Sequence, residues 1–468
     1  MKTEVIRMTM NEYINSLKGK SIGVLGIGVS NIPLIRTLLD HGLTDITACD
    51  VHSEEELGEA AQEFKSRGVK LQLGPDYLEQ LDFDVIFRTP GLMPFDPHLV
   101  HAKEQGSILT SEMEAFLKIC PCRVIAVTGS DGKTTTTTII SELLKKQGFR
   151  VHLGGNIGHP LFSEVEMIQP EDITVLELSS FQLHSMDAHP NIAVITNISP
   201  NHLDKHLDYK DYYDSKANIF LKQNKEDRLI LNARDEMTPY YEGMSAGNIS
   251  YFAREQKVTA GVFSEGDRIY SVEPGAEPQL IMSSTDIILP GVHNLENYLA
   301  AICATRGLVT DETCREVAHT FAGVEHRLER VRVWKGITFI NDSIGTSPTR
   351  TIAGLHAMKK KPILIAGGYD KGIPFEELGV EVNKYCKKVY LTGATARKIY
   401  DSILNAENRE TDHPPVEIVD DFKNCFHAAV SAAEEDDIIL LSPACAAFDH
   451  FKNFMERGKY YKELVAEL

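Results

Sequence analysis

The segment from Val124 to Thr135 combines the residue types that bind polyphosphate. It reads Val-Ile-Ala-Val-Thr-Gly-Ser-Asp-Gly-Lys-Thr-Thr, so an apolar strand enters a glycine turn and hydroxyl-rich helical sequence leaves it. Backbone N–H groups in such a turn, backed by a helix N-terminus, form a nest for anions. Lys133 supplies a positive charge to the phosphates and the Thr134 hydroxyl suits Mg²⁺, although Val127 replaces the first glycine of the strict phosphate-loop motif. The predicted nucleotide contacts are Gly129, Ser130, Asp131, Gly132, Lys133, Thr134 and Thr135.

Three further polar side chains follow apolar strands, at the edge where open α/β sheets bind ligands. Glu177 is flanked by leucine on both sides, which predicts a buried carboxylate, and such burial is costly unless the group is paired or binds a metal. A Mg²⁺ ion on ATP phosphates is a natural partner. His202 is a candidate ligand of a second metal. Taken alone, His202 is more often an ordinary loop histidine, and Lys216 is more often a solvated charge on an amphipathic helix.

Length and composition place these residues in a globular protein of several domains. The 468 residues exceed the roughly 250–300 at which one hydrophobic core stops growing, so we expect two or three domains. Lys plus Arg number 48 and Asp plus Glu 67, a net charge of −19 that argues against a nucleic-acid partner. No apolar stretch approaches the about 20 residues of a membrane span, and the charged start argues against a signal peptide. The eight cysteines form no disulfide framework, which predicts reduced thiols in the cytoplasm, with Cys120 and Cys122 as an alternative redox or metal pair.

Apolar runs rich in β-branched residues alternate with helical stretches along the chain. Three of these runs lead into glycine turns, namely Ser21–Gly28, Arg123–Gly129 and Lys361–Gly368. Because their hydrophobicity is continuous rather than alternating, we expect strands buried on both faces, as in parallel sheets covered by helices. The alternation predicts doubly wound α/β sheets. Residues 245–292 lack helical periodicity, and we expect a small antiparallel excursion there, inside the middle domain.

Six motifs follow one another in a characteristic order: Thr128–Thr135, Leu176–Leu183, Asn201–Asp204, His293–Asn297, Glu325–Glu329 and Asn341–Ser343. Together they resemble the Mur ligase family, whose ATP-dependent enzymes add amino acids to the peptidoglycan precursor. The run Leu440–Gly458 is similar to the signature of the branch that adds D-glutamate. The resemblance covers essentially the whole chain. It implies an α/β fold of three domains: a Rossmann-like UDP-binding domain over 1–119, a central P-loop-type ATPase domain over 120–325, and a Rossmann-like C-terminal amino-acid-binding domain over 326–468.

The resemblance also implies roles for individual residues. Lys133, Glu177, His202 and Lys216 match catalytic positions, and Thr134, Glu177, His202 and Lys216 match positions that hold two Mg²⁺ ions. In the family, the lysine matching Lys216 is carbamylated, which turns a cation into a carboxylate that suits a site with two metals. The remaining ATP contacts implied are Asn294, Asn297, Arg327 and Asp342. The implied contacts to the UDP-linked substrate are Ser30, Asn31, Asp50, Thr89, Pro90, Gly91 and Asn156, and those to D-glutamate are Thr346, Lys371, Ser442, Phe448 and Phe454.

The implied reaction joins D-glutamate to UDP-N-acetylmuramoyl-L-alanine in cytoplasmic peptidoglycan precursor synthesis. The substrate carboxylate attacks the γ-phosphate of ATP to give an acyl phosphate, and the amine of D-glutamate then displaces the phosphate. Two positions depart from the family pattern, because Ile344 replaces a lysine and Ala447 replaces a serine. We therefore expect either that Ser343, Ser442 or a backbone N–H group holds the carboxylates of D-glutamate instead, or that the protein binds D-glutamate weakly.

Other classes of protein share parts of this pattern. A sister ligase with another amino acid, or a folylpolyglutamate synthetase, would have the same central domain, whereas the run Leu440–Gly458 favours the D-glutamate branch. A nicotinamide dehydrogenase is suggested only by Gly26 and Gly28, because Asn31 replaces the third glycine of the dinucleotide fingerprint. A non-catalytic nucleotide-binding module leaves Glu177 without a role. We expect a monomer without a membrane span or a nucleic-acid partner.

Overall fold

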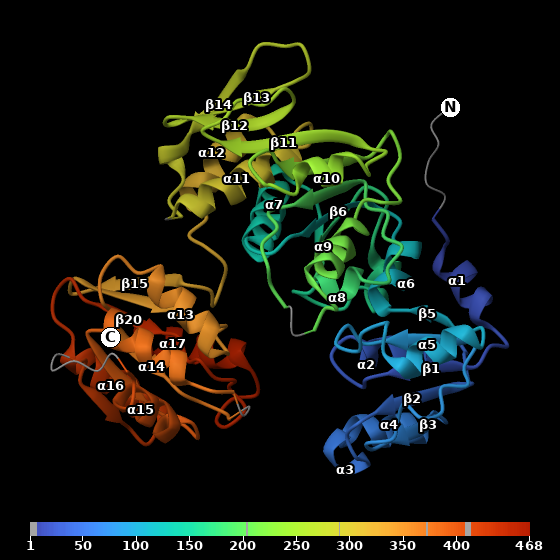
Figure 1. Cartoon of the computed structure of the whole chain (residues 1–468), viewed down its shortest axis with the longest axis horizontal. Helices are drawn as coiled ribbons and strands as arrows, with labels where there is room; N and C mark the ends of the chain where they lie inside the picture. The colour runs from blue at the N-terminus through green and yellow to red at the C-terminus, as the bar shows by residue number, and fades with distance from the viewer. Residues whose placement is uncertain (1–6, 203–204, 290, 371–372, 408–412) are drawn as a thin grey trace. The chain divides into compact units, whose positions relative to one another are not determined.

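The computed structural model describes residues 7–202, 205–289, 291–370, 373–407 and 413–468. The chain divides into two compact units, Met1–Phe321 and Ala322–Leu468, of which the first holds two sheets and the second one (Figure 1). This mixed α/β architecture in three sheets confirms the predicted fold class, and each predicted domain contains one sheet. Within the described ranges, every helix is too short or too polar to cross a membrane.

The first sheet of unit 1 is wholly parallel and has the strand order β3-β2-β1-β4-β5. Chain order reverses at β1, so the carboxyl end of that strand is the switch point at which doubly wound sheets bind ligands. The strands are β1 (Ile22–Leu25), β2 (Ile46–Asp50), β3 (Lys70–Leu73), β4 (Val85–Arg88) and β5 (Ile108–Thr110).

The second sheet of unit 1 has nine strands in the order β14-β13-β12-β11-β10-β9-β6-β8-β7. The central strand β6 leads into the glycine turn and lies between β8 and β9, which also end at that edge. The strands are β6 (Arg123–Thr128), β7 (Val151–Gly155), β8 (Ile173–Glu177), β9 (Ile192–Ile195), β10 (Arg228–Asn232), β11 (Asn248–Arg254), β12 (Gly261–Glu265), β13 (Arg268–Val272) and β14 (Gln279–Ser283).

The segment 245–292 differs from its prediction in one respect. β11 and β12 continue the parallel pairing of the central sheet from β10, and only the pairs β12–β13 and β13–β14 are antiparallel. The expected antiparallel excursion is therefore wrong for β11, because this strand joins the sheet edge that β10 offers. It is right for the hairpins that follow.

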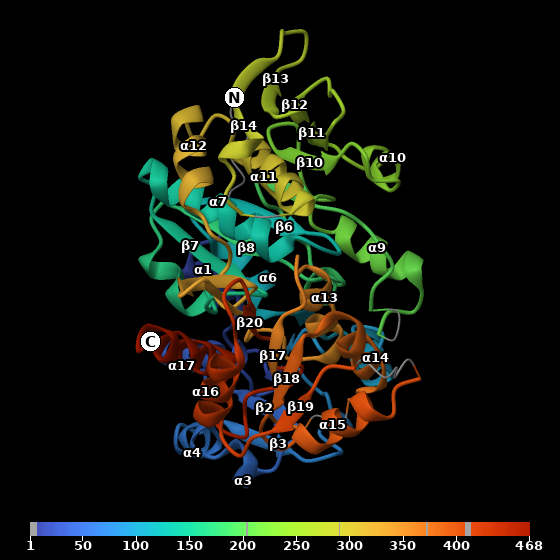
Figure 2. The same ribbon diagram turned by 90° about the vertical axis from the view of Figure 1, so that its left-hand side faces the viewer.

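Alternate residues of β6 face two hydrophobic clusters, which explains why the strand is apolar throughout. Ile125 and Val127 pack with the helices α7 (Lys133–Gln147) and α11 (Val292–Thr305), which lie side by side in both views (Figures 1 and 2). Val124 and Ala126 belong to the other cluster, which continues into the first sheet through residues such as Val24. The two sheets of unit 1 therefore share one core, and burial of each such side chain contributes about 1.5–3 kcal/mol.

Unit 2 has a six-stranded sheet in the order β15-β16-β20-β17-β18-β19, parallel except for the pair β15–β16. Leu364 and Ala366 pack in one cluster with helix residues such as Leu378 and Ile399, whereas Ile363 and Ile365 pack in another with helix residues such as Phe426 and Leu464. Helices therefore cover both faces of the sheet. The strands are β15 (Glu329–Trp334), β16 (Ile337–Asn341), β17 (Ile363–Ala366), β18 (Lys388–Leu391), β19 (Val416–Ile418) and β20 (Ile438–Leu441).

Helix termini follow local capping signals. Thr9 and Ser179 accept hydrogen bonds from backbone N–H groups as parts of capping boxes, and Gly148 ends α7 in the left-handed region. The helices not bounded above are α1 (Met10–Leu17), α2 (Asn31–Asp40), α3 (Glu54–Leu57), α4 (Glu59–Ser66), α5 (Pro97–Glu104), α6 (Glu112–Ile119), α8 (Ser180–Leu183), α9 (Tyr209–Ala217), α10 (Thr238–Glu242), α12 (Asp311–Thr320), α13 (Pro348–His356), α14 (Glu376–Tyr385), α15 (Ala396–Leu404), α16 (Phe422–Ala432) and α17 (Phe454–Ala466).

All eight cysteines are buried and carry free thiols. The sulfur atoms of Cys120 and Cys122 lie 3.7 Å apart, and both lie beside the hydroxyl of Thr174. The separation is that of neighbouring thiols rather than of a disulfide bond, as expected for reduced cysteines.

Candidate active site

The loop after β6 has a backbone that only glycine accommodates at two positions. Gly129 has φ +143°, and a Cβ atom there would lie 2.0 Å from the hydroxyl oxygen of Thr196. Gly132 has φ +75°, and its Cβ would lie 2.2 Å from the side-chain oxygen of Asn297. Both glycines are therefore required by close approach as well as by conformation. The N-terminus of α7 follows at once, which completes the anion nest predicted from the sequence.

Residues that follow β9 hold this loop in place by hydrogen bonds. The backbone N–H of Ser130 donates to the carbonyl of Asn197 at 2.8 Å, and the hydroxyl of Ser130 bonds to the backbone of Ser199. The Thr196 hydroxyl donates to the Asp131 carbonyl at 2.6 Å, and the Asn197 side chain bonds to the backbone of the same residue. The loop is therefore held in one shape by its neighbouring strand.

Two lysines converge on this loop from different helices. The Nζ atom of Lys133 donates to the carbonyl oxygens of Gly129 and Ser130 at 3.0 and 2.9 Å. The Nζ atom of Lys216, from α9, donates to the same Gly129 carbonyl at 2.8 Å. Lys216 is therefore not the solvated charge that its helix alone suggests, since it is only 1% exposed.

Burial sets the charge state of Lys216. Desolvation, reinforced by the nearby positive charge of Lys133, lowers the pKa of the Lys216 amine well below its usual range. The Nζ atom also lies 4.6 Å from the centre of the Tyr212 ring, whose hydroxyl is 2.8 Å from the Ser130 hydroxyl oxygen. The structure thus presents a buried amine that readily loses its proton, next to the phosphate loop.

Glu177 carries a buried oxygen that lacks a partner. Its side chain is 1% exposed at the end of β8, and Oε1 accepts a hydrogen bond of 2.7 Å from the side-chain amide of Asn156. Oε2 is buried without a hydrogen-bond partner among the described residues. Such a carboxylate oxygen is costly unless it binds a cation, and hard oxygen ligands suit Mg²⁺. The residues present therefore fit a magnesium ion at this point.

His202 lies on the loop after β9 with φ +54°, in the left-handed region that non-glycine residues rarely adopt. Its ring contacts Phe181 edge-on at a centroid distance of 5.0 Å and lies 6.5 Å from the Tyr212 ring. Its backbone N–H donates to the side chain of Asn201 at 2.9 Å. His202 is exposed, and its ring lies beside those of Phe181 and Tyr212.

The predicted adenine contacts lie on α11. The side chains of Asn294 and Asn297 are buried and joined by a 3.0 Å hydrogen bond, and Asn297 also accepts from the Thr136 hydroxyl on α7. Asn297 is the residue that excludes a side chain at Gly132. The structure thus brings this pair to the phosphate loop, together with Thr134 and Thr135 in the first turn of α7.

The predicted UDP contacts gather at the carboxyl ends of β1, β2 and β4. Asp50 accepts from the backbone N–H groups of Ile27 and His52, and these bonds hold its pKa below the usual range although burial opposes them. Asn31 is 3% exposed and donates to the carbonyls of the loop at Leu25 and Gly26, which indicates a role in shaping that loop. The remaining predicted contacts at this edge are Ser30, Thr89, Pro90 and Gly91.

In unit 2, Asp342 and Ser442 bond to each other. The Ser442 hydroxyl donates to Asp342 at 2.7 Å, and both residues are buried. Burial raises the pKa of Asp342 to about 6, against the effect of this bond. Arg327 is exposed on the preceding loop, and its charge favours the ionised form of Asp342. Ser442 was expected beside D-glutamate, but its hydroxyl is committed to Asp342 in this structure.

The other predicted D-glutamate contacts are spread over three loops of unit 2. Phe448 is 62% exposed and contacts Tyr369 at a ring-centroid distance of 5.9 Å, whereas Phe454 is half-buried against the His326 ring. The Ser343 hydroxyl, expected to compensate for Ile344 and Ala447, donates to the Phe454 carbonyl at 2.8 Å. Thr346 is half-buried beside Ile344. Lys371 lies outside the described residues.

Comparison with known proteins decides the family. Residues 127–305 match the Mur ligase middle domain, and residues 326–445 match the domain described as Mur ligase, glutamate ligase domain. A UDP-N-acetylmuramoylalanine–D-glutamate ligase of Clostridium beijerinckii is 47% identical over 464 residues, which cover 99% of this chain and 100% of that protein. The chain belongs to the Mur ligase family.

Other relatives and solved structures agree with this membership. Proteins with the same name from Clostridium novyi and Acetivibrio thermocellus are 47% and 46% identical to this Mur ligase over 99% and 97% of the chain. The crystal structure of a UDP-N-acetylmuramate-alanine ligase from Thermotoga maritima matches 96% of this chain and 99% of its own, with a TM-score of 0.55 at 18% identity. At that identity the likeness concerns the fold alone.

Sequence reasoning missed several buried polar residues of this Mur ligase. Tyr212 was not predicted, although it precedes Lys216 by one helical turn and contacts both lysine and loop. Arg457, 2% exposed, donates to the Ser343 hydroxyl and to three backbone carbonyls, those of Ser343, Cys445 and Ala446. Arg88, also 2% exposed, links β4 to the segment after Glu177. The sequence contained a signal for Arg88, because an arginine at the end of a buried strand needs hydrogen-bond acceptors that the fold holds in place.

Proposed function

We propose that this Mur ligase joins D-glutamate to UDP-N-acetylmuramoyl-L-alanine with hydrolysis of ATP, through an acyl phosphate. The observation that carries the ATP chemistry is the meeting of Lys133, Lys216 and Glu177 around one phosphate loop. The names of relatives at 45–47% identity over nearly the whole chain support D-glutamate rather than the amino acid of a sister ligase. These names also favour the ligase over a folylpolyglutamate synthetase, a dehydrogenase or a non-catalytic module.

The chain's own residues position the phosphates. Backbone N–H groups at the start of α7, from Gly132 to Thr135, would bind the phosphates, whereas those of Ser130 and Asp131 are bonded to Asn197. Lys133 would exchange its bonds to the loop carbonyls for contacts with the β- and γ-phosphates. Phosphoryl transfer needs positioning and charge neutralisation more than covalent help from the protein. The substrate carboxylate attacks the γ-phosphorus and ADP leaves. The amine of D-glutamate then attacks the acyl carbon, and phosphate leaves as the amide forms.

Two Mg²⁺ ions would be held by Thr134, Glu177, His202 and Lys216, the last as a carbamate. Bound there, the metal neutralises charge on the phosphates and the acyl phosphate. The unpartnered Oε2 of Glu177 supports this assignment. The lowered pKa of Lys216 supports carbamylation, because only a neutral amine attacks CO₂, with loss of one proton from nitrogen. The carbamate then offers oxygen atoms and a negative charge to the metal, whereas a lysine ammonium has no lone pair to donate.

Substrate contacts complete the proposal. Ser30, Asp50 and Thr89–Gly91 would bind the UDP end at the switch point of the first sheet, with Asn31 shaping the loop, and Asn156 would meet the bound substrate while holding Glu177. In unit 2, Arg327 and Asp342 are proposed nucleotide contacts. Residues proposed for D-glutamate are Thr346, Lys371, Ser442, Phe448 and Phe454. The proposal further places the protein in the cytoplasm, as a monomer.

The deciding experiment measures phosphate release from ATP in the presence of UDP-N-acetylmuramoyl-L-alanine. D-Glutamate, L-glutamate, a diamino acid and no amino acid are compared at one enzyme concentration. Turnover that depends on D-glutamate supports the proposal, and shows that Ile344 and Ala447 are tolerated. Turnover with another amine reassigns the amino-acid pocket of unit 2. Turnover in none of the mixtures contradicts the proposed reaction.

A further inference from the structure

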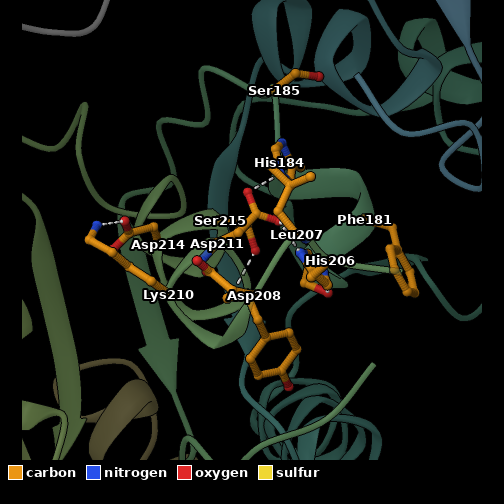
Figure 3. A network of polar contacts seen from close by, with 12 residues as sticks. Phe181, His184, Ser185, His206, Leu207, Asp208, Lys210, Asp211, Asp214 and Ser215 are labelled. Carbon is orange, nitrogen blue, oxygen red and sulfur yellow. Dashed lines mark hydrogen bonds and ion pairs between the residues drawn. The ribbon is translucent and has the colours of Figure 1, made fainter. Parts of the chain in front are cut away.

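Three side chains that play no part in the proposed chemistry, those of His184, His206 and Asp211, form a network of polar contacts (Figure 3). Asp211, on α9, receives one imidazole at each carboxylate oxygen. Oδ1 lies 2.7 Å from Nε2 of His184, and Oδ2 lies 2.7 Å from Nδ1 of His206. The two rings stack at a centroid distance of 5.7 Å, so both are fixed in orientation as well as in distance.

The network reaches a third segment through the second nitrogen of His206. Its Nε2 lies 3.0 Å from the hydroxyl oxygen of Ser180, the first residue of α8, and the His206 side chain is completely buried. The network therefore ties together the start of α8, the loop that ends at His206, and helix α9. Ser180 and His184 lie far from His206 and Asp211 in the sequence, so these contacts add to the packing of α8 on α9 in fixing the separation of the segments.

The protonation states are mutually consistent. Asp211 lies between one ring nitrogen of His184 and one of His206, an arrangement that suits a carboxylate accepting from two N–H donors. A neutral His206 donates from Nδ1 to Asp211 and accepts at Nε2 from the Ser180 hydroxyl. A carboxylate that receives two N–H donors is satisfied within the protein. Each of the three polar contacts of the network therefore pairs a hydrogen-bond donor with an acceptor.

Each tied segment carries one of the proposed metal ligands. Glu177 precedes Ser180 by three positions, His202 precedes His206 by four, and Lys216 follows Asp211 by five on the same helix. Aromatic contacts also join the network to His202, one of the proposed metal ligands. The Phe181 ring stacks on His206 at a centroid distance of 5.4 Å and contacts His202 edge-on at 5.0 Å.

We propose that the His184–Asp211–His206 network positions Glu177, His202 and Lys216 relative to one another and so sets the metal affinity of the active site. This inference rests on the proposed function, since it needs the metal ligands assigned there. Asp211, His184 and His206 are positioning residues, because they act through the backbone of the ligand-bearing segments. Partners that orient metal ligands typically change metal affinity by about 10–100-fold when they are removed.

The test compares Asp211→Ala with a matched variant in the same unit. His189 and Asp227 form a pair of the same type, with 2.8 Å between Nε2 and Oδ2, at the start of β9 and β10 and hence at the opposite edge of the sheet. Asp227 is 4% exposed, against 17% for Asp211, so its loss disturbs the fold at least as much. Asp227→Ala is therefore the control for general destabilisation.

Binding of Mn²⁺ is measured by electron paramagnetic resonance in the presence of a non-hydrolysable ATP analogue, with Tm measured without metal or nucleotide. We expect Asp211→Ala to weaken Mn²⁺ binding about tenfold or more, and Asp227→Ala to leave it unchanged while lowering Tm at least as much. Asp211→Asn should give an intermediate affinity, because it keeps one acceptor oxygen and the shape of the side chain. The readout does not require D-glutamate or turnover.

Three outcomes overturn the inference. Equal Mn²⁺ affinity in the wild type and Asp211→Ala would show that the network has no influence on the metal ligands. Stoichiometric binding of Zn²⁺ alone to the wild type, lost in Asp211→Ala, would make the two histidines and the carboxylate a metal site instead, since these are ligands that Zn²⁺ uses. A wild type that binds no Mn²⁺ beyond that held by the nucleotide contradicts the proposed metal site, and the inference with it.

Discussion

The side-chain nitrogen of Lys216 donates to the backbone carbonyl of Gly129, with 2.8 Å between Nζ and the oxygen. The bond places a buried amine of lowered pKa against the loop that is shaped for phosphate. Because the neutral fraction of an amine rises with pH, a lowered pKa makes the reactive form available near neutrality. Addition of CO₂ to this neutral amine, with loss of one proton from nitrogen, would create a negatively charged carbamate at this point.

Carbamylation of Lys216 is the first prediction. With ¹³C-labelled bicarbonate, we expect one carbamate signal in the ¹³C NMR spectrum at pH 7.5 to 8.5, with loss of the signal on acidification. Lys216→Arg should abolish the signal and the ATP-dependent turnover. Lys210→Arg, on the exposed face of the same helix, should retain both. A signal that survives in Lys216→Arg would assign the modification to another lysine.

Replacement of Glu177 by glutamine separates catalysis from stability. Loss of the charge should reduce turnover about 100-fold, as when other groups that stabilise developing charge are removed. Tm without Mg²⁺ should not fall, because Oε2 is buried without a partner and the bond from Asn156 can persist. The measurements are phosphate release and thermal unfolding.

Asp172→Asn is the matched control for Glu177→Gln. Asp172 precedes the same strand, is 4% exposed, and bonds to His152 at the opposite end of the strand. The Asp172→Asn variant should have a lower Tm than the wild type and the same turnover at saturating substrate. Equal turnover in Glu177→Gln and the wild type would remove Glu177 from the proposed metal site.

The strands and the phosphate loop were predictable because their signals are local. Continuous apolar runs such as Arg123–Gly129 can only be buried on both faces, and β6 occupies that run. The alternating packing of Ile125 and Val124 into two clusters follows directly. The edge pairing of β11 was not predictable, since a strand of that composition fits a parallel edge and a hairpin equally well.

The polar network around the site was not predictable from sequence. His184 and Asp211 are far apart in the chain, and nothing in their local sequence shows that they meet. Asn31 and Ser442 matched substrate contacts of the family. Tertiary packing places other groups of the protein beside them, and both side chains bond to those groups. Motifs identified the candidate residues, whereas the structure shows which of them bond to other groups of the protein.

Arg88 links the proposed UDP-binding loop to the segment after Glu177, a proposed metal ligand. Its guanidinium donates to the carbonyls of Leu92 and Phe181 at 3.1 and 2.9 Å and to the Ser185 hydroxyl. Burial lowers its pKa to about 10. Arg88→Met should leave these acceptors unpaired, lower the free energy of unfolding by about 2 kcal/mol, and raise KM for the UDP-linked substrate.

The matched control for Arg88 is Arg36→Met. Arg36 forms an exposed ion pair with Glu63 on the same domain, and exposed pairs contribute about 0–1 kcal/mol. We expect little change in Tm and none in KM for that control. A fall in Tm for Arg88→Met with unchanged KM would reduce Arg88 to a structural residue.

Glu112 gives unit 1 a pH-dependent stability. Burial raises the pKa of this carboxyl to about 7, although the backbone N–H of Phe162 donates to it at 2.9 Å. Between the ordinary value of 4.5 and about 7 the folded state therefore binds more protons than the unfolded state, so the free energy of unfolding falls as pH rises through this window.

Glu112→Gln keeps the acceptor oxygen without titrating, and its free energy of unfolding should exceed that of the wild type by up to about 3 kcal/mol at pH 8.5. Tm of both proteins between pH 5 and 8.5 measures this gain, with Glu142→Gln, an exposed carboxylate on α7, as control. Parallel curves for Glu112→Gln and the wild type would show that the buried carboxyl does not titrate in this range.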